Sequence, residues 1–164
     1  MLTEVSEFDA CDDRILAELQ RDARITMAEL GRRVHLSQPA VTERVRKLET
    51  SGVIKGYRAE VDLTRLGYGI RAIIRVARAE YARVVKLIGQ TPEVLNAYNV
   101  TGEDSWVLEI AVIDVQHLDA VVSKFCLLST TSTSIVLNAP RENAQVLPAR
   151  RENIKPSAQK VSPP

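Results

Sequence analysis

The first third of the chain carries its hydrophobic residues at helical spacing, in three short blocks separated by polar breaks. A repeat of three to four residues places apolar side chains on one face of a helix, so three such helices can enclose a small core. We therefore expect three helices between residues 8 and 48. Their inward positions are Ile15, Leu16 and Leu19, then Met27, Leu30 and Val34, and finally Val41, Val45 and Leu48.

The ends of these helices carry recognisable capping residues. Thr26 and Glu29 have the spacing of a capping box, in which each side chain satisfies a free backbone N–H group of the first turn. Ser37 is a good N-cap for the third helix, and Pro39 follows in its first turn, where a missing N–H group does no harm. Gly52 lies just past the expected end of that helix, where a glycine is favoured.

From residue 70 onward the hydrophobic period changes to two, which is typical of strands, with two helical stretches in between. The strands are expected at 70–76, 94–100, 106–112 and 132–137. The helices are expected at 81–90, with Tyr81, Val84, Val85 and Ile88 facing inward, and after an Asp114 cap, with Val115, Leu118, Val122 and Phe125 facing inward.

The order strand-helix-strand-strand-helix-strand predicts a ferredoxin-like βαββαβ domain. Its two helices cover one face of an antiparallel sheet and leave the other face open. Ile73, Val107 and Ala111 make that second face partly apolar, which favours dimerisation by packing one sheet on another.

Charge is distributed unevenly along the chain. The net charge is only +1, but residues 32–58 carry seven basic and two acidic side chains, whereas residues 1–31 carry three basic and eight acidic ones. A local basic patch is what a polyanionic partner requires. The acidic start resembles no signal peptide and no run is long enough to cross a bilayer, so we expect a soluble cytoplasmic protein without a membrane partner.

The outward face of the third helix combines short hydrogen-bonding residues with basic residues that follow them. Such side chains read base edges in a major groove and contact phosphates, respectively. An ordinary polar surface helix is the alternative, and the three-helix context favours DNA. The residues predicted to contact bases are Ser37, Gln38 and Thr42, and those predicted to contact phosphates are Arg32, Arg44, Arg46, Lys47 and Lys55.

The ordered motifs of residues 8–58 resemble the N-terminal domain of the Lrp/AsnC family of feast/famine regulators. One departure is His35, where the family usually has glycine; that turn is expected to need a positive φ, which histidine tolerates better than most residues. The matching positions are Phe8-Asp9, Asp12, Ile15-Leu16, Leu19, Asp22, Arg24, Glu29-Leu30, Val34, Leu36-Ser37, Arg44-Val45, Leu48-Glu49, Gly52-Val53-Ile54 and Gly56-Tyr57.

Residues 70–137 resemble the family's C-terminal domain, chiefly through the loop from Val100 to Ser105 and the strand after it. The resemblance implies that this loop binds a small effector such as an amino acid, with backbone N–H groups for a carboxylate and an acidic side chain for an ammonium group. Ser105 departs from the usual acid, and a plain hairpin turn is the alternative. The candidate effector residues are Gly102, Glu103, Asp104 and Ser105.

These observations predict an α+β protein with a winged, three-helix helix-turn-helix domain (1–56), a linker strand and connector (57–69), a ferredoxin-like domain for assembly and sensing (70–140) and a flexible tail (141–164). We expect a homodimer that assembles further into a tetramer or octamer on double-stranded DNA, with paired helices in successive major grooves.

Three other classes of function are weighed against this regulator. The first is an assembly or sensor module without DNA binding, and the basic face of Arg44, Arg46, Lys47 and Lys55 argues against it. A broad-specificity architectural DNA-binding protein shares the features of the regulator, and decarboxylase-type enzymes share the two-domain layout. Neither histidine has a catalytic partner at a telling spacing, and Cys11 and Cys126 have no metal-ligand spacing. We therefore expect no enzyme activity, no catalytic residue, no metal and no cofactor.

Overall fold

The computed structural model describes residues 8–149 and divides the chain into two compact units. The first comprises the chain up to Ala59 together with the segment from Asn143 onward, and the second runs from Glu60 to Glu142. The chain therefore passes between the units twice. The predicted tail divides here: residues 143–149 belong to the first unit, and 150–164 lie outside the described residues.

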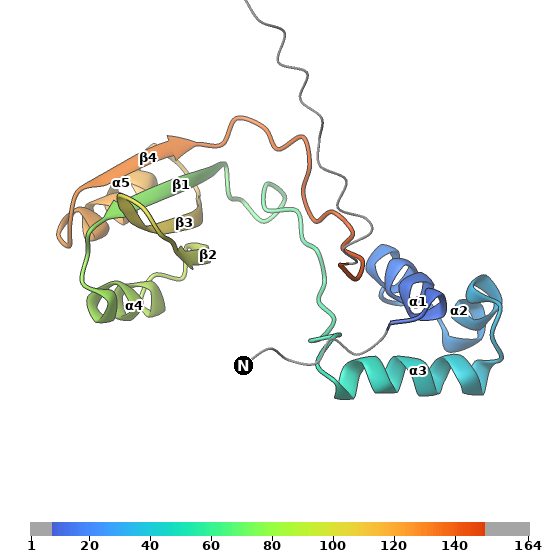
Figure 1. Ribbon diagram of the computed structural model, residues 1–164. Coiled ribbons are helices and arrows are strands. Elements are labelled where there is room, and N and C mark those ends of the chain that lie inside the picture. Colours follow the sequence, from blue (N-terminus) through green and yellow to red (C-terminus); the bar gives the residue numbers. More distant parts are fainter. Residues whose placement is uncertain (1–7, 150–164) are drawn as a thin grey trace, which may run out of the picture. The chain divides into compact units, whose positions relative to one another are not determined.

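Three helices build the first unit, as the sequence predicts (Figure 1): α1 (Ala10–Arg21), α2 (Met27–Val34) and α3 (Gln38–Thr50). The predicted inward residues form its core, except that Met27 is only partly buried at its margin. Ile25, between α1 and α2, adds a buried side chain that the helical pattern alone does not indicate.

The helix caps agree with the sequence in outline. The Thr26 hydroxyl accepts a hydrogen bond from the Glu29 N–H group at 3.2 Å, but the Glu29 carboxylate turns to Arg33 instead of the backbone, so the described contacts confirm only half of the expected capping box. A full capping box occurs at α1, where the Asp9 and Asp12 side chains each accept a backbone N–H. Carboxylates at this end also complement the helix dipole.

The chain reverses sharply between α2 and α3. His35 has φ 60° and ψ 43°, which confirms the left-handed conformation predicted for it. Gly31, in the last turn but one of α2, lies so close to the next segment that an added Cβ would be 2.7 Å from the carbonyl oxygen of Leu36. The close approach of the two helices therefore depends on glycine at position 31.

Neither the predicted wing nor the linker strand forms within the single chain. Residues 51–69 are all described and contain neither helix nor strand. They include a turn in which the Tyr68 N–H donates to the carbonyl of Leu63. Because strands need a partner for their backbone groups, residues 57–62 do not form one where no neighbouring strand is available.

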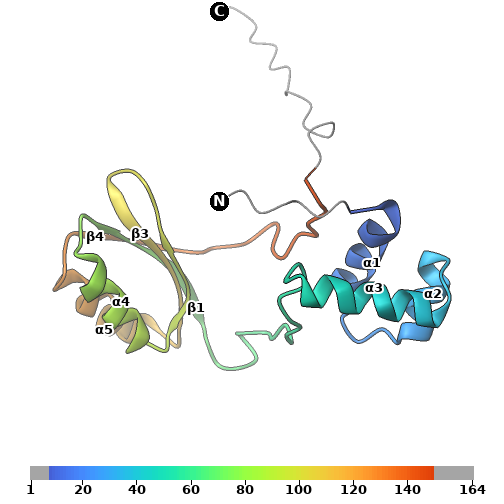
Figure 2. The same ribbon diagram turned by 60° about the horizontal axis from the view of Figure 1, so that its bottom comes forward.

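The second unit has the predicted ferredoxin-like topology (Figure 2). Its four strands pair antiparallel throughout in the order β2-β3-β1-β4, and α5 packs against β1, β3, β4 and α4 on one face of the sheet. The elements are β1 (Ile70–Ala77), α4 (Tyr81–Gly89), β2 (Val94–Asn99), β3 (Asp104–Val112), α5 (Val115–Cys126) and β4 (Thr131–Ile135).

Three inward positions predicted for the helices are wrong. Tyr81 and Val115 each stand in the first turn of a helix and are 62% and 63% exposed, and Val85 is exposed as well. The Tyr81 ring instead packs beside Trp106, with 5.3 Å between ring centroids. On α5, Val121 is buried in the core where Val122 was predicted. Leu118, Val121 and Phe125 lie on the same face of this helix.

The open face of the sheet is less apolar than expected. Ile73 and Val107 are half-buried on it, but Ala111 is already covered within the unit.

None of the helices within residues 8–149 is long and apolar enough to cross a membrane.

Candidate nucleic-acid interface and effector loop

Helix α3 separates an apolar face from a polar one. Val41, Val45 and Leu48 are buried in the core, which fixes the rotation of the helix about its axis. The opposite face is exposed and carries Gln38, Thr42, Glu43, Arg46 and Lys47. The structure thus brings most of the predicted DNA-contacting side chains onto one exposed surface.

The hydroxyl groups on this surface differ in what they can still donate. Ser37 accepts the N–H of Ala40 at 3.4 Å as the N-cap of α3, so its own hydroxyl proton remains available. Thr42 donates its proton to the carbonyl of Gln38 at 2.8 Å and keeps only acceptor capacity. Against a base edge, Ser37 is suited to an acceptor and Thr42 to an amino group.

Two of the predicted phosphate contacts are paired with acidic neighbours. The Arg46 guanidinium binds both carboxylate oxygens of Glu43, at 3.0 and 2.6 Å, and Arg32 pairs with Glu29. The hydrogen bonds from Arg46 hold the pKa of Glu43 below its ordinary value. These pairs are exposed, so water and salt screen them and a phosphate can replace the carboxylate.

The lysines are placed differently. Lys47 and Lys55 are exposed, and within residues 8–149 no ion pair engages either of them. Their ammonium groups are therefore free to contact phosphates without breaking an intramolecular contact.

Arg44 is turned toward α1. Its Nη1 atom lies 2.7 Å from a carboxylate oxygen of Asp9 and 2.9 Å from one of Asp12. The hydrogen bond to Asp12, followed by that to Asp9, raises the pKa of Arg44. Arg44 therefore forms ion pairs that link α3 to the start of α1, and this link is called the Arg44 tie below. The sequence gives no sign of this, because the partners are 32 residues apart.

The candidate effector residues form the turn that joins β2 to β3. Gly102 has φ 120° and, like Glu103, is exposed, whereas Asp104 and Ser105 begin β3. The Ser105 hydroxyl accepts the N–H of Ala79 at 3.3 Å, so this side chain supports the loop between β1 and α4. Within residues 8–149, the turn thus offers the Gly102 backbone and two acidic side chains without an ion pair.

Comparison with known proteins gives matches to both units. Residues 8–49 match the AsnC-type helix-turn-helix domain and residues 71–146 the Lrp/AsnC ligand binding domain. The HTH-type transcriptional regulator LrpC of Bacillus subtilis is 34% identical over 134 residues, covering 80% of this chain and 93% of LrpC. The leucine-responsive regulatory protein of Rhizobium meliloti is 34% identical over 149 residues, covering 85% and 96%.

Solved structures agree with these matches. The structure of Bacillus subtilis LrpC has a TM-score of 0.77 to this chain and covers 81% of it, with 96% of LrpC matched. A transcriptional regulator from Neisseria meningitidis, solved as a complex with L-methionine, has a TM-score of 0.79 at 28% identity, covering 85% of this chain and 96% of that one.

Proposed function

Because the chain belongs to the Lrp/AsnC family of transcriptional regulators, we propose that it binds double-stranded DNA through α3 and regulates transcription as an oligomer that responds to a small metabolite. The observation that carries the DNA contact is the exposed face of α3. Its opposite face is locked into the core, so the polar face must point outward, where a major groove can receive it.

The proposed contacts divide by chemistry. Ser37 caps α3, Gln38 and Thr42 lie in its first turns, and all three read base edges. Arg32, Arg46, Lys47 and Lys55 contact phosphates, with the lysines most accessible and the arginines exchanging a carboxylate for a phosphate. Arg44 acts through its tie to α1, by holding α3 in place, rather than on the DNA directly.

The second unit is proposed to assemble the protein. The sheet has helices on one face only, and the open face carries Ile73 and Val107, which are half-buried in the single chain. A homodimer that covers this face, and associates further into a tetramer or octamer, would bring two α3 helices to successive major grooves about 34 Å apart.

An amino acid is the proposed effector at the turn from Gly102 to Ser105. The similar regulator from Neisseria meningitidis was solved with L-methionine, and free backbone and acidic groups suit an amino acid's carboxylate and ammonium. Such a ligand regulates only if it binds one assembly more tightly than another.

The deciding experiment is a titration of the protein on a DNA fragment that spans its own promoter, over a range of salt, with and without the twenty amino acids. We expect tight, salt-sensitive binding that changes with the amino acids. Tight binding that ignores them contradicts the proposed effector. Similar affinity for unrelated DNA would indicate an architectural protein instead of a sequence-specific regulator.

A further inference from the structure

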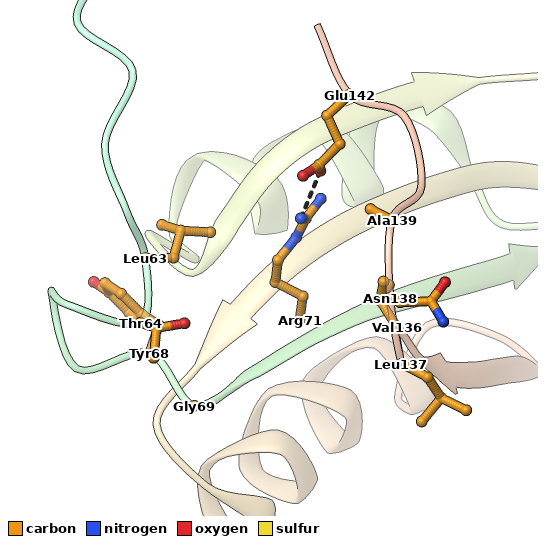
Figure 3. A pocket seen from close by; sticks show the side chains of 10 residues that line it. All are labelled: Leu63, Thr64, Tyr68, Gly69, Arg71, Val136, Leu137, Asn138, Ala139 and Glu142. Atoms are coloured by element: carbon orange, nitrogen blue, oxygen red, sulfur yellow. Dashed lines mark ion pairs between the residues drawn. The ribbon is translucent and has the colours of Figure 1, made fainter.

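A pocket of about 240 Å³ lies at the start of β1 (Figure 3). Its walls come from the connector before β1, through Leu63, Thr64 and Tyr68, and from the segment after β4, through Val136 and Asn138. The turn from Gly102 to Ser105 lies at the other end of the sheet, because Ile70 pairs with Val112 and Ala77 with Asp104. The pocket is therefore separate from the proposed effector turn.

Arg71 is the cationic group of this pocket, and it lies between two carboxylates. Its Nη2 atom donates to Glu109, and its Nη1 atom lies 2.6 Å from an oxygen of Glu142. Its Nε atom is buried without a hydrogen-bond partner among the described residues. In Figure 3 the Arg71 and Glu142 side chains point toward each other across the pocket.

The two carboxylates are held with unequal firmness. Glu109 belongs to β3, its side chain is 18% exposed, and it also accepts a hydrogen bond from Asn96 at 2.7 Å. Glu142 lies in the irregular segment after β4, and its side chain is 45% exposed. An exposed ion pair on an irregular segment is weak, so Glu142, the partner of Nη1, is the carboxylate that a ligand can replace.

We propose that this pocket binds a small organic carboxylate, which replaces Glu142 at the Arg71 guanidinium. The exchange leaves the charge balance at the guanidinium unchanged, because one carboxylate takes the place of another. Leu63, Tyr68 and Val136 receive the apolar body of the ligand, and Thr64 supplies a hydrogen bond. The volume is below the ~300–1,000 Å³ of sites for drug-sized ligands, so the ligand is a metabolite of a few carbons.

This exchange would act on the connection between the units. Glu142 is the last residue of the second unit, and the chain continues directly into residues that belong to the first. There, Gln145 Nε2 donates to the carbonyl of Ala17 at 3.0 Å, and Val146 exchanges two backbone hydrogen bonds of 2.8 Å with the Gln20 amide. The segment from Glu142 to Val146 is thus held at both ends, and a bound carboxylate would release the Glu142 end.

The test measures binding without DNA, by isothermal titration calorimetry of the full chain with 3-methylbutanoate and with its neutral amide. We expect saturable heat with the acid and none with the amide. Arg71→Gln should weaken binding by at least about tenfold, the typical worth of a hydrogen bond to a charged group. Glu142→Gln should strengthen it, because the competing carboxylate is gone.

Arg83→Gln is the matched control, since Arg83 is an exposed arginine on α4, outside the pocket lining and away from the sheet face proposed for the dimer. It should leave binding unchanged. The proposal is overturned if the acid does not bind saturably, if the amide binds equally well, or if Glu142→Gln leaves the affinity unchanged. The Glu142→Gln measurement remains decisive even if Arg71→Gln fails to fold.

Hydrogen exchange tests the coupling. With saturating 3-methylbutanoate, the amides of residues 143–149 should exchange faster, and unchanged exchange would overturn the release of this segment. Any effect on transcription rests on the proposed function, but neither readout involves DNA. A protein that binds the carboxylate and not its promoter would refute the proposed function and leave this site standing.

Discussion

At the scale of single residues, the basic side chains around α3 have three distinct situations. Arg44 is tied to Asp9 and Asp12, Arg46 is paired with an exposed carboxylate, and Lys47 has no ion pair in the described part of the chain. A sequence count treats them as equivalent cations. The structure predicts that their removal has different consequences for folding and for DNA binding.

Arg46→Ala should weaken binding to every DNA sequence, because a phosphate contact carries no sequence information. Each lost contact should reduce the slope of log K against log salt by ~0.9. The measurement is a set of fluorescence anisotropy titrations over a range of salt. Arg83→Ala, which removes an exposed arginine from α4, is the control and should change neither affinity nor slope.

Gln38→Ala serves as the contrasting variant in the same titrations. It should change the ranking of DNA sequences while leaving the salt slope intact, since Gln38 is proposed to read bases. An unchanged slope in Arg46→Ala, or a uniform loss across sequences in Gln38→Ala, would contradict the proposed orientation of α3.

At the scale of elements, the turn between α2 and α3 decides how closely the two helices approach. Gly31 provides the space and His35 the left-handed residue. Histidine at that position carries a conformational cost that glycine would avoid, and it is accepted because the Leu36 N–H still closes the turn on the carbonyl of Gly31 at 2.8 Å.

Gly31→Ala should destabilise the first unit by about 1–3 kcal/mol, the usual cost of overpacking a tight contact. The added Cβ would meet a backbone carbonyl, which cannot rotate away as a side chain does. Urea unfolding followed by circular dichroism measures the change.

Gly89→Ala is the matched control, because Gly89 ends α4 and an added Cβ meets nothing within 4 Å. It should change the free energy of unfolding by no more than about 0.5 kcal/mol. Equal effects of the two substitutions would show that the close contact at Leu36 is not limiting.

At the scale of the whole molecule, ion pairs in both units hold carboxylates in their charged form. In the second unit, the His117 side chain is the largest cause that lowers the pKa of Glu93, and the two groups are 2.9 Å apart. The other carboxylates with a lowered pKa are Asp9, Glu18, Glu29, Glu43 and Glu109.

Acid should therefore unfold the protein. A lowered pKa in the folded state means that the unfolded chain binds protons first, so these groups stabilise the fold above their ordinary pKa values of 3.8 for Asp and 4.5 for Glu. This stabilisation should be lost as the pH falls below these ordinary values and then through the lower pKa values of the folded state. Urea unfolding at a series of pH values down to about pH 3 measures this loss.

Glu93→Gln should make the decline with acid shallower, because the amide keeps its shape but binds no proton in this range. Glu103→Gln, in the exposed turn after β2, is the control. If the Glu93→Gln and wild-type curves run parallel, Glu93 does not contribute to the acid dependence.

The sequence by itself determined the elements and their order. Local patterns decide these, because the periods of 3.6 and 2 reflect the geometry of the backbone and the caps act within one turn. The core stripes of the first unit apart from Met27, the βαββαβ order and the left-handed His35 were predicted and are confirmed. The ordered motifs were also sufficient to identify the family.

Only the tertiary structure decided which side chains meet. The tie from Arg44 to Asp12, the Gly31 contact and the pocket at Arg71 each join residues brought together by the fold, and no local pattern records such distances. The same reason explains why the wing and the linker strand do not form within the single chain, and why the inward placement of Tyr81 and Val115 was wrong. A strand exists only if a neighbour pairs with it, and a residue at a helix end is buried only if something covers it.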